Sequence, residues 1–166
     1  MTSNKNYYVI DTSSLIELNR KYPIEVFPSL WKKVEELISK SALISHKEVF
    51  NEVCIQDDKL KEWAKKQRTF FRDITPKQIE IVKGLLNQYP SLSTQNNDRY
   101  AADVFVIALA IELQQAPQQT LFPNGHLIVT EEKIRGNKLK IPFVCQSFNI
   151  KCIDILEMYR AEGWTF

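Results

Sequence analysis

Short apolar runs alternate with longer amphipathic segments along the chain, and this alternation predicts an α/β fold. The runs at 7–10, 41–45, 127–130 and 151–154 have the length, or the β-branched and aromatic content, typical of strands. Segments with helical spacing separate or follow them, at 14–20, 30–38, 49–54, 57–71, 75–86, 101–113, 141–148 and 156–161. Strands that alternate with helices indicate a parallel sheet covered on both faces. We therefore predict one three-layer α/β/α domain over residues 1–166, with a central, mainly parallel sheet.

The composition is that of an ordinary globular domain and narrows the function only slightly. A net charge of +2 argues against wholesale electrostatic binding of nucleic acid but leaves room for a local basic patch. No apolar run reaches transmembrane length, and the polar start MTSNKN is not a signal peptide. The three cysteines form no CxxC pair and there are only two histidines, which argues against a disulfide framework or a zinc site. We expect a cytoplasmic protein without membrane contact.

Acidic side chains recur where predicted strands end. Asp11 directly follows the first strand, and Glu131 and Glu132 directly follow strand 127–130. Because the carboxyl ends of parallel strands meet at one edge of a sheet, these side chains should lie close together. Asp103 lies near the start of an apolar helix, where a carboxylate is costly to bury unless it is paired or coordinates a cation. The pattern predicts a carboxylate cluster at this edge.

The helix after the second strand offers one further candidate. On a helical wheel, Glu48 points almost directly away from the apolar face, whereas Glu52 lies nearer its border. We therefore expect Glu52 to reach inward and Glu48 to be solvated.

Each of the other acids has a plain structural alternative. Asp11 would then begin a turn, with a following serine as the helix cap. Asp103 would pair with Arg99, one turn before it, and Glu131 and Glu132 would both be solvated.

Carboxylates gathered without histidine or cysteine suit a hard cation, Mg²⁺ or Mn²⁺. Such an ion would neutralise the mutual repulsion of the acids and activate water for attack on a phosphate. The hydroxyls of Thr12, Ser13 and Thr130 would orient the carboxylates or water molecules around it.

Taken together and in order, these motifs resemble those of the PIN-domain nucleases. They are DTSSLI after a strand, Glu52 within SHKEVFNEV, Asp103 within ADVFVIALA, and the acidic pair of LIVTEE. The resemblance implies a PIN-like fold in which Asp11, Glu52, Asp103 and Glu132 bind the metal and carry catalysis. Where this chain has Glu132 the family usually has Asp, so Glu131 remains an alternative ligand.

Trp31, LKEWAKK and IPFVCQSFNIK resemble, more narrowly, a group of compact single-domain bacterial PIN-like proteins. This resemblance implies a metal-dependent endoribonuclease that hydrolyses RNA phosphodiester bonds, and PIN proteins of this size are often toxins of toxin–antitoxin modules. The implied partners are RNA and an antitoxin protein, or a second copy of the chain. We expect the phosphates of the substrate to contact the cations after the acidic pair: Lys133, Arg135, Lys138 and Lys140.

Two other functions share part of this pattern. A haloacid-dehalogenase-like phosphatase also has Asp at the end of its first strand but needs a second Asp two residues later, where this chain has Ser13. A PIN-like scaffold that binds RNA or protein without catalysis would keep the same cleft, and Glu132 in place of Asp is compatible with it. Trp31 and Trp63 are predicted to be core residues rather than platforms for stacked bases.

Overall fold

The computed structural model describes residues 5–93, 102–116, 126–133 and 141–166. Its sheet contains β1 (Tyr7–Ile10), β2 (Leu43–His46), β3 (Phe71–Arg72), β4 (His126–Val129) and β5 (Cys152–Ile153). The five strands lie in the order β3-β2-β1-β4-β5, and every neighbouring pair is parallel. The predicted α/β class with a parallel central sheet is therefore confirmed.

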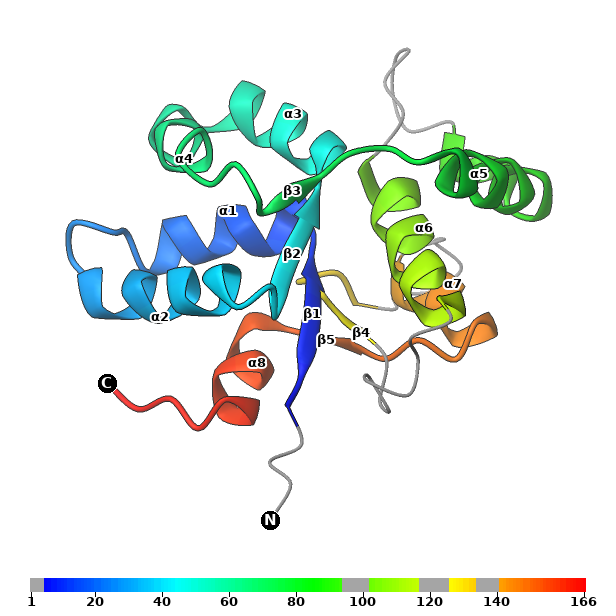
Figure 1. The fold of residues 1–166 in the computed structure, drawn as a ribbon. Helices are drawn as coiled ribbons and strands as arrows, with labels where there is room; N and C mark the ends of the chain where they lie inside the picture. The colour runs from blue at the N-terminus through cyan, green and yellow to red at the C-terminus, as the bar shows by residue number, and fades with distance from the viewer. Residues whose placement is uncertain (1–4, 94–101, 117–125, 134–140) are drawn as a thin grey trace.

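Helices cover both faces of the sheet (Figure 1). One layer contains α1 (Thr12–Lys21), α2 (Pro28–Ser39) and α8 (Ile155–Ala161), and the opposite layer contains α5 (Pro76–Gln88), α6 (Ala102–Gln115) and α7 (Ile141–Ser147). Helices α3 (Lys47–Gln56) and α4 (Asp58–Ala64) follow β2 at its carboxyl end, and a short 3-10 helix spans Pro90–Ser93. This arrangement is the predicted three-layer architecture.

Helix α6 is the central element of its layer. Nine of its residues are buried, and Val106, Ile107 and Ala108 are completely inaccessible to solvent, because the helix packs against β1, β2 and β4 as well as α3, α5 and α7. An apolar surface on nearly all sides is what a helix in this position requires. Within the described ranges, neither α6 nor any other helix has the combination of length and apolarity needed to cross a membrane.

The segment predicted as one helix over 57–71 is divided in the structure, and that prediction is wrong beyond Ala64. Helix α4 ends at Ala64, turns follow, and Phe71–Arg72 form β3 beside Ser45 and His46 of β2. A two-residue strand has no detectable periodicity, so only its pairing with β2 identifies it.

The two tryptophans at helical spacing belong to the core, as predicted. Their rings meet edge to face with centroids 4.9 Å apart, and both side chains are more than nine-tenths buried. Trp31 Nε1 donates to the Tyr22 carbonyl at 2.7 Å, and Trp63 Nε1 donates to Glu35 at 3.0 Å. Both indole donors are therefore satisfied inside the protein.

Candidate functional site

The candidate site lies where the order of strands reverses. From β1 the chain continues toward β2 and β3 on one side of the sheet, whereas β4 and β5 lie on the other side. In sheets of this kind ligands bind at the carboxyl ends of the two strands that flank the reversal. Here those ends are joined directly, because the Asp11 N–H donates to the Val129 carbonyl at 3.0 Å.

Asp11 is the centre of this junction and is only 1% exposed. It caps the first turn of α1, accepting from the Ser14 N–H at 2.8 Å. Its two carboxylate oxygens share the Ser13 hydroxyl at 2.9 and 2.8 Å, and the Thr130 hydroxyl donates to one of them at 2.6 Å. Asp11 is thus both a helix cap and a buried anion held by two hydroxyls.

Burial dominates the electrostatics of Asp11. Desolvation raises the pKa of this carboxyl from 3.8 to about 6, against the opposing effect of its hydrogen bonds, and the charge of Glu132 adds to the rise. The ionised form of Asp11 is therefore unfavourable in this setting. A cation near the carboxylate would reverse that balance.

The hydroxyls expected around Asp11 behave differently from one another. Ser13 and Thr130 both donate to its carboxylate, and Ser13 also accepts from the Glu131 N–H at 3.1 Å. Thr12 makes no such bond: its hydroxyl is buried without a hydrogen-bond partner among the described residues. Ser13 and Thr130 position Asp11, and Thr12 does not.

Glu131 and Glu132 diverge although they are adjacent. Glu131 Oε1 accepts from the Ile155 N–H at the start of α8 (3.0 Å) and from the Ser14 hydroxyl at 3.4 Å. Glu132 is held toward the opposite layer, since its Oε2 accepts from the Ile141 N–H at the start of α7 (3.1 Å) and its own N–H donates to Thr130. The charge of Glu132 is among the causes that raise the pKa of Asp11.

Glu52 lies at the N-terminus of α6, the helix that carries Asp103. The side chain of Glu52, on α3, accepts from the Ala102 N–H at 3.0 Å and so caps the helix that carries Asp103 in its first turn. Negative charge is favourable at both positions, because the first N–H groups of a helix have no partner within the helix. Glu52 therefore reaches inward, as predicted, whereas Glu48, which was predicted to be solvated, is partly buried as well.

These acids do not form a compact ligand set. In the ranges that the structure describes, no three His, Cys, Asp or Glu side chains are grouped so that they could hold one metal ion. Of the four predicted phosphate contacts, Lys133 is exposed beside Glu132, whereas Arg135, Lys138 and Lys140 lie outside the described residues.

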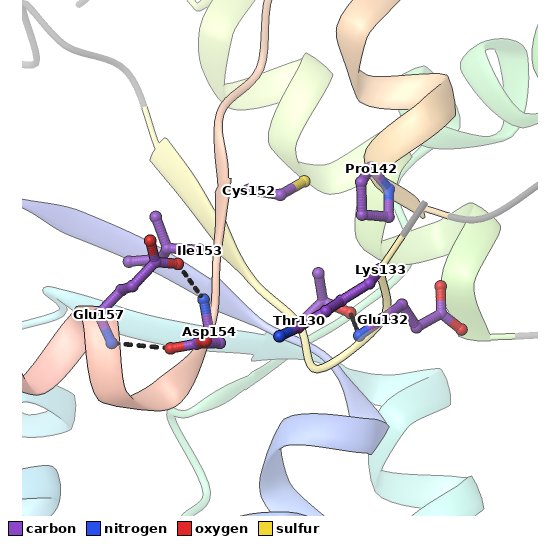
Figure 2. A pocket seen from close by; sticks show the side chains of 8 residues that line it. All are labelled: Thr130, Glu132, Lys133, Pro142, Cys152, Ile153, Asp154 and Glu157. Carbon is purple, nitrogen blue, oxygen red and sulfur yellow. Dashed lines mark hydrogen bonds between the residues drawn. The ribbon is translucent and has the colours of Figure 1, made fainter. Parts of the chain in front are cut away.

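A pocket of about 280 Å³ adjoins Glu132 at the carboxyl ends of β4 and β5 (Figure 2). Thr130, Glu132 and Lys133 line one side, and Cys152, Ile153 and Asp154 line the other. Asp154 and Glu157 cap the first turn of α8 reciprocally: the Glu157 N–H donates to Asp154 at 2.8 Å and the Asp154 N–H donates to Glu157 at 2.9 Å. Their carboxylates therefore have a structural role.

A family model described as a domain of unknown function, DUF4411, matches residues 8–166. The chain belongs to the DUF4411 family. No curated protein and no solved structure matches it significantly.

The sequence analysis did not predict two backbone N–H groups that bind carboxylates of this DUF4411 site. The Ser14 N–H binds Asp11, and the α7 N-terminus at Ile141 binds Glu132. The first has a recognisable signal, because Asp followed by hydroxyl residues before an apolar helix is a capping pattern. The bond from the Ile141 N–H to Glu132 depends on where α7 packs, which no local sequence pattern predicts.

Proposed function

We propose that this DUF4411 chain is a divalent-metal-dependent endoribonuclease of the PIN type. The observation that supports it best is Asp11, a buried carboxyl with a pKa raised to about 6 at the end of a central strand. A group so destabilised in its charged form is more typical of a functional site than of a turn.

The carboxylate oxygens of the candidate site suit a hard cation, although in the described residues they are not grouped around a single point. The residues that would hold Mg²⁺ or Mn²⁺ are Asp11, Glu52, Asp103 and Glu132, which are all oxygen donors. A bound ion would supply charge neutralisation and an activated water molecule for phosphodiester hydrolysis. Ser13 and Thr130 would keep the Asp11 carboxylate in one orientation throughout, since both already donate to it.

The substrate side of the proposal rests on Lys133. Lys133 lines the same pocket as Glu132 (Figure 2), and we expect its ammonium group to contact a phosphate that enters there. Arg135, Lys138 and Lys140 follow it in sequence and are proposed to extend the same contact.

Incubation of the purified chain with defined RNAs tests the proposal directly. We expect cleavage with Mn²⁺ or Mg²⁺ and complete loss of cleavage with EDTA, because the acids need a cation before they admit a phosphate. A matching single-stranded DNA establishes which nucleic acid is preferred. Absence of metal-dependent cleavage of every RNA would argue against the enzyme.

Mutations of the two adjacent glutamates are expected to have different effects. Glu132→Gln is expected to weaken Mn²⁺ binding and RNA cleavage at least tenfold, because it alters the carboxylate whose charge reaches Asp11. Glu131→Gln should lower the free energy of unfolding by about 1 kcal/mol through its weaker bond to the Ile155 N–H, and leave Mn²⁺ binding unchanged. Calorimetric titration and urea unfolding measure these effects. If Glu131→Gln instead weakened Mn²⁺ binding and Glu132→Gln did not, Glu131 would be the ligand.

One observation favours a second function, a PIN-like module that binds RNA or protein without catalysis. It is the absence, within the residues that the structure describes, of any grouping of three ligands around one point. Calorimetry distinguishes the two proposals: Mn²⁺ binding that disappears in Asp103→Asn supports the nuclease, whereas RNA binding without any Mn²⁺ heat supports the binding module.

The biological setting proposed here follows from the same resemblance. A PIN-type ribonuclease of this size would act in the cytoplasm as the toxin of a toxin–antitoxin pair, with an antitoxin protein or a second copy of the chain as its partner. Co-expression with the product of the neighbouring gene is the direct test, since a cognate antitoxin should co-purify and suppress cleavage.

A further inference from the structure

A second and larger pocket, of about 470 Å³, lies between the sheet and the α5–α6 layer. Its walls include Ile44 of β2 and Leu109 and Leu113 of α6, and its polar groups include Arg72 and Glu112. Glu112 lies about 14 Å along α6 from Asp103, because an α-helix rises about 1.5 Å per residue. The pocket is therefore at the far end of α6 from the candidate ribonuclease site.

Glu112 is a preorganised acceptor in this pocket. One of its oxygens accepts from the Thr75 hydroxyl at 2.6 Å, and the other accepts from the Gln78 side-chain amide at 2.7 Å. A carboxylate oxygen accepts about two hydrogen bonds, so each oxygen retains the capacity for one more donor. The fixed carboxylate is suited to a ligand that presents two adjacent N–H groups.

The orientation of Gln78 is itself determined by His46. The Nδ1 atom of His46 accepts from the Glu48 N–H at 3.0 Å, so the ring proton is on Nε2, which donates to the Gln78 amide oxygen at 2.9 Å. The amide oxygen is thereby engaged, and the amide nitrogen faces Glu112. The His46 ring also stacks on Phe105 with centroids 5.1 Å apart. The acceptor arrangement is consequently built into the fold before any ligand arrives.

Arg72 provides the opposite charge at the rim. It is exposed, and no described carboxylate lies within ion-pair distance of it, whereas its neighbour Asp73 pairs with Lys47 at 3.4 Å. His126, also in the lining, stays uncharged at neutral pH because burial, together with the charge of Arg72, lowers its pKa to about 4. A guanidinium is suited to bind a phosphate group with two parallel hydrogen bonds.

We propose that this pocket binds a guanine nucleotide, with the base edge on Glu112 and the phosphate at Arg72. Guanine alone among the common bases presents two adjacent N–H donors on its Watson–Crick edge, which match a carboxylate. Adenine and cytosine would place a ring-nitrogen lone pair against it, and uracil offers a single donor between two carbonyl oxygens. The apolar walls formed by Ile44, Leu109 and Leu113 suit the flat faces of the base.

Calorimetric titration of the full chain with GMP in the presence of EDTA tests this site without reference to RNA cleavage. GMP is expected to bind at least tenfold more tightly than AMP. Glu112→Gln should weaken GMP binding at least tenfold, because it replaces one acceptor oxygen by a donor. Arg72→Gln should weaken GMP binding but leave guanosine binding unchanged, since guanosine has no phosphate.

Two control variants locate the binding. Arg68→Gln removes an exposed arginine outside the pocket lining, and Asp11→Asn alters the candidate ribonuclease site, so both should bind GMP as the wild type does. Circular dichroism establishes that each variant is folded, and if Glu112→Gln is not, Arg72→Gln with GMP and guanosine still decides. Absence of GMP binding, equal affinity for AMP, or loss of GMP binding in Asp11→Asn would overturn the assignment.

Discussion

Replacement of Asp11 by asparagine is expected to abolish metal-dependent RNA cleavage and, without metal, to make the protein more stable. Cleavage should fall at least about 100-fold, because even residues that only support metal ligands change activity by about 10–100-fold. In buffer with EDTA at pH 7, the free energy of unfolding should rise by about 1–3 kcal/mol. That rise follows from removing a buried charge, and urea unfolding measures it.

The sign of the stability change follows from the pKa of Asp11. The folded state holds this proton up to about pH 6, whereas the unfolded chain releases it near 3.8. The protonated group therefore stabilises the fold below pH 3.8, and this contribution is lost as the pH rises to about 6. The loss is at most about 3 kcal/mol, at about 1.36 kcal/mol per pKa unit. Asparagine has no proton to lose, so the variant should lack this decline between pH 4 and 6.

Mn²⁺ should affect the melting temperatures of the wild type and the Asp11→Asn variant differently. Mn²⁺ is expected to raise the melting temperature of the wild type, since an ion that binds only the folded state stabilises it by about 2.7 kcal/mol at 100 times its Kd. The Asp11→Asn variant should show no such rise. Asp57→Asn is the matched control, because Asp57 also caps a helix through its side chain but lies outside the candidate site. Full cleavage by Asp11→Asn, or a less stable variant, would contradict the assignment.

Trp31→Ala is expected to cause the largest loss of stability, about 3–5 kcal/mol, as is usual when a buried aromatic residue is truncated. The side chain is 2% exposed, packs edge to face on Trp63, and donates to the Tyr22 carbonyl. Trp31→Phe should lose less, about 1–2 kcal/mol, because it keeps a ring but not the indole donor. Urea unfolding monitored by circular dichroism measures both.

Phe166→Ala serves as the control for Trp31, since Phe166 is 66% exposed and its truncation should change the free energy of unfolding by less than about 0.5 kcal/mol. The pair also tests the alternative use of tryptophan as a platform for stacked bases. If Trp31→Ala kept full stability and lost only RNA binding, the core assignment would be wrong.

Much of the fold was predictable because its signals are local. The run YYVI before Asp11, the apolar α6 segment and the Thr75–Pro76 start of α5 depend on side-chain period and capping chemistry within a few residues. Strand β3 was not predictable in this way. Its two residues are identified only by their pairing with Ser45 and His46, about 26 positions earlier.

The candidate site was likewise predictable only in part. That Asp11, Asp103 and the pair Glu131–Glu132 were candidates followed from their position after strands or inside an apolar helix. The direction of each carboxylate did not follow, because it depends on which backbone N–H group lies opposite. Ile155 holds Glu131, Ile141 holds Glu132, and Ala102 holds Glu52.

The sequence by itself determined most helices and strands of this protein, though not β3, and the chemical class of its acids, because periodicity, capping and residue type act over a few positions. Only the tertiary structure decided that Asp11 is buried between two hydroxyls, one of them Thr130, which lies more than 100 positions away. It also decided that Glu112 meets Thr75 and Gln78 in a second pocket. Both results depend on burial and on the meeting of distant segments, which no local pattern encodes.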